Sequence, residues 1–305
     1  MSLYSLFKSN GPSGFGYGTT AEQVTEGLNL TGKTYLVTGC NSGLGLETLR
    51  VLALRGALVL GTARTVEKAK AACDSVKGKT HPLACELSEP ASVRACVAEV
   101  KRQGFVLDGI ICNAGIMALP KLEQAFGYEL QFFTNHIGHF ILVTGLLDQL
   151  REDGRVVMLS SAAHMRAPRE GIQFDNLSGE KGYQDWTAYG QAKLANMLFA
   201  KELARRFAGT KRTANAVHPG VISTNLSRHM AAFQVFVFKT FGPLVLKTVP
   251  EGAATQVYAA THPSLASTSG EYLADCNVST PRSDANDAAL ARKLWEVSEQ
   301  IVAKL

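Results

Sequence analysis

A tyrosine and a lysine four positions apart are the first side chains in this sequence whose types and spacing could carry out chemistry. Tyr189 and Lys193 lie in a helix-compatible run rich in Ala, Leu, Lys and Glu, from Tyr183 to Ala208. Residues i and i+4 share one face of a helix, so the phenol and the ammonium group would be neighbours. A nearby cation favours the phenolate and lowers the pKa of a tyrosine, which suits proton transfer in carbonyl chemistry. Taken alone the pair is a weak signal, because most such pairs combine an amphipathic residue with a solvated charge.

A glycine-rich loop upstream could bind phosphate groups. Thr38 to Gly45 reads TGCNSGLG and separates a short apolar run from a helical pattern. Its glycines allow a tight turn and let backbone N–H groups approach a pyrophosphate at the start of the helix. The position directly after a predicted strand favours a dinucleotide-binding loop. The contact residues predicted in this loop are Gly39, Asn41, Ser42, Gly43, Leu44 and Gly45.

Short apolar runs alternate with amphipathic stretches along the chain, and these elements must position the reactive groups. Strands are predicted at 33–38, 57–63, 81–87, 107–112, 155–159, 213–217 and 270–273. Helices are predicted at 20–28 (capped by Thr20), 44–55, 66–76, 88–102 (capped by Ser88), 126–150, 183–208 and 285–303. This alternation predicts an α/β fold, a Rossmann-type doubly wound parallel sheet with helices on both faces. A leader at 1–29 would precede a single domain at 30–305.

Composition narrows the class of protein. The chain has 305 residues, 46% of them hydrophobic and 19% charged, as is usual for a globular protein with a large core. A net charge of +5 without a dense Lys/Arg block argues against a nucleic-acid partner. Six scattered cysteines form no CxxC pair, and no metal site is predicted. With no signal peptide and no apolar span of membrane length, we expect a cytoplasmic protein with free thiols.

The ordered set of motifs resembles the short-chain dehydrogenase/reductase family from Leu30 to the C-terminus. TGxxxGxG comes first, then Asn113-Ala114-Gly115 after the fourth predicted strand, then Tyr189-x-x-x-Lys193. The segments GYELQFFTNHIGHF, LSSAAH, AYGQAKLANMLFAKEL, HPGVIST and GEYLADC are similar to the retinol-dehydrogenase-like branch. The resemblance implies an oxidoreductase that interconverts a carbonyl and an alcohol with a nicotinamide cofactor.

The resemblance also implies a catalytic tetrad. Tyr189 would be the general acid/base, and Lys193 would bind the nicotinamide ribose and lower the pKa of the tyrosine. Ser161 would hydrogen-bond the substrate oxygen, while Ser160 would be structural. Asn135 would hold a water-linked proton path to the lysine.

Further cofactor contacts follow from the same resemblance. Asn113, Ala114 and Gly115 would form the wall of the adenine-ribose pocket. The loop after the sixth strand would contact the nicotinamide carboxamide through Pro219, Gly220, Val221 and Thr224. Glu86 and Leu87 would lie beside the adenine, although the family often has Asp where this chain has Glu86.

The end of the second predicted strand bears on the choice of cofactor. NAD enzymes place an Asp or Glu there for the ribose 2′-hydroxyl, whereas a basic residue accommodates a 2′-phosphate. Here the strand ends at Arg64, and the next acid is Glu67. The sequence therefore predicts a preference for NADP(H) over NAD(H).

Two segments flank the Tyr/Lys helix and would border the substrate. The stretch between Ser161 and Tyr189 is long and contains His164 and Trp186. After the Pro-Gly loop, an apolar segment carries Phe233 and Phe236. We expect a substrate lid at about 225–250, with attachment to a membrane surface and a dimer contact as the competing interpretations.

A lipophilic substrate fits these segments: a retinoid, a steroid, or a long-chain or aromatic ketone or aldehyde. Two alternatives stay open, a non-catalytic NADP-binding regulatory or scaffold protein and a C=C reductase of a large pigment-like molecule. Family members often pair through two long helices, which implies a homodimer or homotetramer.

Overall fold

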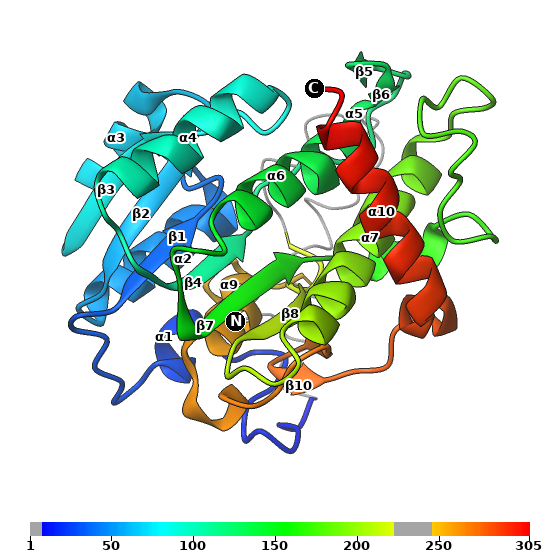
Figure 1. Ribbon diagram of the computed structural model, residues 1–305. Helices are drawn as coiled ribbons and strands as arrows, with labels where there is room; N and C mark the ends of the chain where they lie inside the picture. The colour runs from blue at the N-terminus through cyan, green and yellow to red at the C-terminus, as the bar shows by residue number, and fades with distance from the viewer. Residues whose placement is uncertain (1–7, 223–245) are drawn as a thin grey trace.

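A twisted sheet of eight strands forms the centre of the structure, a computed structural model that describes residues 8–222 and 246–305 (Figure 1). Its strand order is β10-β9-β8-β7-β4-β1-β2-β3, and β10 alone among them runs antiparallel to its neighbour. The strands are β1 (Thr34–Val37), β2 (Leu58–Ala63), β3 (Lys79–Ala84), β4 (Leu107–Cys112), β7 (Leu150–Leu159), β8 (Thr213–His218), β9 (Tyr272–Ala274) and β10 (Asn277–Val278).

Helices cover both faces of this sheet. On one face lie α4 (Pro90–Arg102), α6 (Gly138–Gly145) and α7 (Asp185–Arg206), with α10 (Ala288–Val302) packed along α7 (Figure 1). On the other face lie α1 (Ala21–Val24), α2 (Gly43–Leu54), α3 (Val66–Asp74) and α9 (Val249–Thr261). The predicted doubly wound α/β sheet is therefore confirmed.

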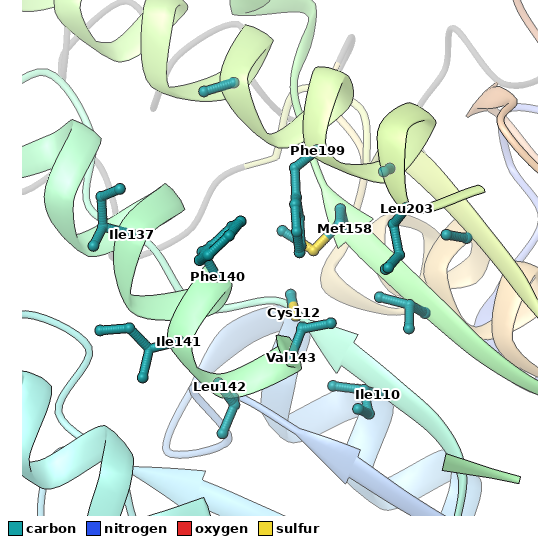
Figure 2. Close-up of a cluster of buried hydrophobic side chains, with 14 of the residues drawn as sticks. Ile110, Cys112, Ile137, Phe140, Ile141, Leu142, Val143, Met158, Phe199 and Leu203 are labelled. Carbon is teal, nitrogen blue, oxygen red and sulfur yellow. The ribbon is translucent and has the colours of Figure 1, made fainter. Parts of the chain in front are cut away.

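Alternating side chains build a separate core on each face. In β1, Leu36 enters the core under α4, α6 and α7, whereas Tyr35 and Val37 enter the core under α2 and α9. This follows from the two-residue period of a strand. Figure 2 shows the first core, in which Phe140 of α6 and Phe199 of α7 pack with ring centroids 5.4 Å apart. The apolar burial of α7 anchors the helix that carries the Tyr/Lys pair.

The strand order reverses between β1 and β4. The chain proceeds from β1 through β2 to β3 on one side, and from β4 through β7 to β8 on the other. The loops leaving β1 and β4 therefore diverge and leave a crevice at the carboxyl ends of these strands. In open α/β sheets this switch point is where ligands bind.

The helix predicted at 126–150 is present but shorter, because the helical run extends only from Leu130 to Gly145 and includes a π-helical turn. A small hairpin, β5 (Gln124–Ala125) and β6 (Tyr128–Glu129), occupies its start, with left-handed φ angles of 54° at Phe126 and 80° at Gly127. It is followed by α5 (Leu130–Phe132), a π-helical turn at Phe133–Ile137 and then α6. Leu150 belongs instead to β7, where it pairs with Leu107. The π-helical turn contains no proline that would mark it in the sequence.

Other boundaries also differ from the sequence prediction. Ser88 does not cap α4, because its hydroxyl donates to the Glu86 carboxylate and Glu89 is the N-cap residue. The third strand begins at Lys79 and ends at Ala84, and α9 and β10 were not predicted. The Thr20 cap of the first helix is confirmed by a complete capping box, although the helix ends at Val24.

Candidate active site

A cavity of about 430 Å³ opens at the carboxyl ends of β1, β2, β3 and β4. Its wall contains most of the residues predicted to bind the cofactor: Gly39, Asn41, Ser42, Gly43, Leu44, Arg64, Glu86, Leu87, Asn113, Ala114 and Gly115. Segments that are far apart in the sequence thus meet at the topological switch point. The volume and the position suit a large, elongated ligand.

The glycines of the loop after β1 are required by its geometry. Gly39 has a φ of +72° and Gly43 a φ of +56°, both in the left-handed region that favours glycine. A Cβ on Gly45 would lie 2.1 Å from the Gly39 carbonyl oxygen and 2.6 Å from Nδ2 of Asn113. Gly45 therefore lies behind the cavity wall, where it lets α2 approach the ends of β1 and β4.

The N-terminus of α2 has the features of an anion-binding site. Ser42 is its N-cap residue, but the Ser42 side chain makes no capping hydrogen bond. The first N–H groups of a helix have no partner within the helix, and the helix dipole favours negative charge there. A pyrophosphate at this point would satisfy these groups, so the loop fits a dinucleotide.

Charged groups lie at the mouth of the cavity beyond β2. Arg64 follows β2, its side chain is 66% exposed, and its Nε is 3.9 Å from the carboxylate of Glu86. The other Glu86 oxygen accepts from Ser88, so this carboxylate faces back into its own turn. The exposed guanidinium is the cation at this end of the described cavity wall.

The segment after β4 is held by a hydrogen-bond network. Nδ2 of Asn113 donates to the Thr38 carbonyl at 2.8 Å, and the backbone N–H of Ala114 donates to the Thr38 hydroxyl at 3.0 Å. Gln256 of α9 is fully buried and donates to both Asn113 Oδ1 and the Thr48 hydroxyl. These bonds fix the two sides of the crevice relative to each other.

Asn135 lies in the π-helical turn and is fully buried. Its side-chain amide accepts from the backbone N–H of Ile116 at 2.8 Å and donates to the Ile116 carbonyl at 2.9 Å. Its backbone carbonyl accepts from Nδ1 of His139, whose Nε2 lies 2.9 Å from the Thr38 hydroxyl. The π-helical turn thus ties Asn135 to the cavity wall.

Tyr189 and Lys193 lie on one face of α7, as the spacing predicts. Both are buried, and Nζ of Lys193 is 5.6 Å from the centroid of the Tyr189 ring. This Nζ donates to the Leu159 carbonyl at 3.0 Å and lies 3.5 Å from where a Cβ on Gly115 would be. Because Leu159 and Gly115 line the cavity, Lys193 lies at its inner wall.

Ser161 follows β7 and faces Tyr189. The two side chains are hydrogen-bonded, and Oγ of Ser161 also accepts the backbone N–H of Ala163 at 3.1 Å. The preceding Ser160 is buried, and its hydroxyl donates to the Lys193 carbonyl at 2.8 Å. Ser161 therefore faces the reactive pair, while Ser160 ties β7 to α7.

Burial dominates the ionisation of the pair. It raises the pKa of Tyr189 to about 12, with the Ser161 hydrogen bond opposing the shift, and lowers the pKa of Lys193 to about 8. The expected lowering of the tyrosine pKa by the lysine is therefore not seen, because Nζ lies over the ring and donates to Leu159. At neutral pH the phenol is protonated, which is the form that can donate a proton.

The two substrate residues predicted before the helix have different surroundings. Trp186 is half-buried and packs edge-on against Tyr189, with ring centroids 6.1 Å apart. His164 is buried with both nitrogens engaged, Nδ1 with the Ser161 carbonyl and Nε2 with the backbone N–H of Arg282, so its contact with the substrate stays a prediction. Phe233 and Phe236, and most of the lid predicted at 225–250, lie outside the described residues.

The loop after β8 does not line the cavity described above. Pro219, Gly220 and Val221 follow β8, and Gly220 has a φ of +93°. A Cβ on Gly220 would lie 2.6 Å from Cδ of the buried Lys247, so this loop packs on the start of the segment leading to α9. Thr224 lies outside the described residues.

Several cavity residues were missed by the sequence analysis. Most are next to predicted ones and could have been found by extending each motif by one or two positions: Ala63, Cys85, Ser88, Ile116 and Met117. Thr134 and Leu159 likewise lie within two positions of Asn135 and Ser161, whereas Leu130 comes from α5. Gln256, which bonds Asn113 of the cavity wall, belongs to a helix that was not predicted.

Within the described ranges, no group of three or more His, Cys, Asp or Glu side chains is placed to hold a metal ion. All six cysteines are buried free thiols. The helices of the same ranges include none that is long and apolar enough to cross a membrane.

Comparisons with known proteins show which family the chain is similar to. A family model described as short chain dehydrogenase matches residues 33–234. The short-chain dehydrogenase TIC 32 A, chloroplastic, of Brassica napus is 39% identical, and the alignment covers the whole of both chains. Human retinol dehydrogenase 14 is 36% identical over 90% of this chain and 87% of its own length.

A solved structure is also similar over most of its length. The crystal structure of an uncharacterized protein from Mycobacterium paratuberculosis is 32% identical, with a TM-score of 0.76. The match covers 92% of this chain and 97% of the other. This match supports the α/β fold described above.

Proposed function

This chain belongs to the short-chain dehydrogenase family and to its retinol-dehydrogenase-like branch, and we propose that it interconverts a carbonyl and an alcohol on a lipophilic small molecule with NADP(H). Oxidoreduction of this kind with a nicotinamide cofactor is the activity of the family. The observation that supports the specific proposal is the meeting of Asn135, Ser161, Tyr189 and Lys193 beside the cavity at the switch point.

The cofactor would lie along the cavity. Its pyrophosphate fits the open N-terminus of α2, and the adenosine end fits the wall from Arg64 to Asn113. The exposed Arg64 supports a 2′-phosphate, since a guanidinium binds phosphate in a forked geometry and no acid follows β2 at that point. The chemistry expected of the bound cofactor is hydride transfer.

Each polar residue of the tetrad would then have one task. The protonated Tyr189 phenol would donate its proton to the substrate oxygen as charge develops there. Ser161 would hydrogen-bond the same oxygen and stabilise that charge. Lys193 would bind the nicotinamide ribose and add positive charge behind the phenol. Asn135 would keep the cavity wall at Ile116 in place and lead protons toward the lysine.

The described part of the substrate side includes an aromatic ring next to Tyr189. Trp186 packs against Tyr189, and Arg166 lies 4.9 Å above the Trp186 ring. Retinol dehydrogenases among the relatives are named for a lipophilic alcohol. A retinoid, a steroid, or a long-chain or aromatic carbonyl compound fits this environment, and attachment to a membrane surface would give access to such substrates.

A panel of carbonyl compounds tests the proposal. We expect oxidation of NADPH, followed by its absorbance, with at least one of all-trans-retinal, a steroid ketone, a long-chain aldehyde and an aromatic ketone. Tyr189→Phe should lower kcat by roughly 100-fold or more, since general acid catalysis contributes about that much, while NADPH still binds.

Tyr258→Phe is the matched control. Tyr258 lies in α9, on the face of the sheet opposite α7, and its hydroxyl bonds Ser264, so this variant should leave turnover unchanged. Equal turnover by the wild type and Tyr189→Phe would contradict the mechanism. Binding of NADPH without turnover of any carbonyl would favour a regulatory or scaffold protein.

A further inference from the structure

The position of Ser161 depends on the short turn that follows it. Ser161 is the N-cap residue of a 3₁₀ turn, Ala162–Arg166, and its Oγ accepts the N–H of Ala163. The same Oγ is hydrogen-bonded to Tyr189. Any shift of this turn would therefore change the distance between the serine hydroxyl and the phenol.

One side of the turn rests directly on α7. A Cβ on Gly190 would lie 2.7 Å from the Ala163 carbonyl oxygen and 2.7 Å from the Ala167 nitrogen. Only a residue without a side chain permits this approach. Gly190 is the neighbour of Tyr189, so the turn and the phenol share one contact point on the helix.

The other side of the turn is held by Arg282, which comes from the C-terminal segment after β10. Its guanidinium donates to the carbonyls of Ala167, at 2.6 Å, Pro168 and Arg169, and pairs with Asp284 at 2.8 Å. The side chain is 15% exposed. Three successive carbonyls bound by one guanidinium fix the end of the turn in a way that a single ammonium could not reproduce.

His164 forms a second link between the same partners. Nδ1 lies 2.6 Å from the Ser161 carbonyl, and Nε2 accepts the backbone N–H of Arg282 at 3.2 Å. Because Nδ1 faces a carbonyl oxygen, it must carry the hydrogen, which leaves Nε2 as the acceptor. The ring also packs edge-on against Tyr272 of β9, with centroids 5.2 Å apart.

We infer that Arg282 is a positioning residue for the reaction: with His164 it presses the turn after Ser161 against Gly190 and so sets Ser161 against Tyr189. It touches neither the cavity wall nor the tetrad itself. This inference rests on the proposed role of Ser161, and it concerns turnover, not cofactor binding.

The test compares Arg282→Met and Arg282→Lys with Arg292→Met, in which an exposed arginine of α10 loses its charge. With the panel carbonyl that turns over fastest, Arg282→Met should lower kcat by roughly 10- to 100-fold, the cost of a misplacement near 1 Å. Arg282→Lys should recover only part of this loss, the Kd for NADPH should stay within about twofold, and Arg292→Met should behave as wild type.

A double-mutant cycle with Ser161→Ala separates the inference from the proposed function. If Arg282 acts through Ser161, Arg282→Met should lower kcat little further in the Ser161→Ala background. Full additivity, or wild-type kcat in Arg282→Met while Ser161→Ala is impaired, would overturn the positioning role. An unimpaired Ser161→Ala would instead contradict the proposed function.

Hydrogen exchange provides a measurement that needs no substrate. The backbone amides of residues 162–167 should exchange faster in Arg282→Met than in the wild type or Arg292→Met, while those of α7 keep their protection. Unchanged exchange in this turn would also overturn the inference. Loss of protection across the whole sheet would mean that Arg282→Met unfolds generally. The exchange of residues 162–167 in Arg282→Lys would then test the inference in its place.

Discussion

At the scale of single residues, the site is governed by burial. Tyr189 and Lys193 both lie inside the protein, and low solvation favours the neutral form of each. The pKa of the phenol therefore rises to about 12, while that of the ammonium falls to about 8. A phenol that holds its proton beside a hydrogen-bonded Ser161 is well suited to protonate the oxygen of a carbonyl that is being reduced.

Replacement of Lys193 by Met should change how stability depends on pH. The lysine pKa is about 8 in the folded protein and 10.5 as its ordinary value, so the unfolded chain binds more protons between these values. The free energy of unfolding of the wild type relative to Lys193→Met should rise by about 2 kcal/mol from pH 7.5 to 9.5. Urea unfolding at the two pH values measures this. A difference that stays constant would show that Lys193 is not held in a poorly solvated site.

Arg64 is the residue on which cofactor choice depends in our proposal. Arg64→Ala should weaken NADPH binding by roughly 10- to 100-fold, the worth of a charge-assisted hydrogen bond to the 2′-phosphate. Binding of NADH, which lacks that phosphate, should change little. Titration of both cofactors checks this, with the exposed Lys304→Ala as the control for net charge. Wild-type protein that prefers NADH tenfold would contradict the assignment.

At the scale of elements, α9 supports the cofactor cleft from behind. The side-chain amide of Gln256 donates to Oδ1 of Asn113 and to the Thr48 hydroxyl. Both oxygens accept here, because Nδ2 of Asn113 donates to the Thr38 carbonyl and the Thr48 hydroxyl donates to the Leu44 carbonyl. One amide therefore connects α9, α2 and the end of β4. No local sequence signal identifies such a connection.

Gln256→Leu should loosen this connection. The buried Oδ1 of Asn113 would lose a donor, which should lower the free energy of unfolding by about 1–3 kcal/mol. NADPH affinity should fall several-fold because Asn113 lies in the cavity wall. Chemical unfolding and cofactor titration measure the two effects. Lower stability with unchanged affinity would limit Gln256 to a structural role.

At the scale of the whole molecule, two cores share one sheet, and the core under α6 and α7 contains two histidines. His136 bonds Ser298 of α10, and His139 bonds Thr38, which directly follows β1. Burial lowers the pKa of His136 to about 3 and that of His139 to about 4. Two neutral imidazole rings thus connect this layer: His139 joins α6 to the end of β1, and His136 joins the π-helical turn to α10.

Acid should therefore destabilise the fold through these two rings. The unfolded chain binds protons near the ordinary histidine pKa of 6.5, so stability is lost as pH falls below that value. Between pH 7 and 5 the loss from the pair should be about 3–4 kcal/mol. Urea unfolding of wild type and the His136→Gln/His139→Gln double variant measures it, with the half-exposed His81→Gln as control. Equal pH dependence of wild type and double variant would refute this explanation.

The sequence by itself determined the fold class, the glycine loop and the family. These depend on local patterns: the two-residue and 3.6-residue periods of apolar side chains, glycines after a strand, and a Tyr/Lys pair one helical turn apart. Each is set by neighbours in the chain, so each can be found without knowing the distant contacts. The NADP preference and the role of each tetrad residue remain proposals.

Only the tertiary structure decided which side chains meet and which are available. It shortened the helix predicted at 126–150 to Leu130–Gly145 with a π-helical turn inside it, and it placed His164 against the Ser161 carbonyl. It also placed Gln256 behind Asn113 and Arg282 behind Ser161. These residues come from segments far apart in the sequence, and the energies that set burial, pKa and hydrogen bonding there arise only once the chain has packed.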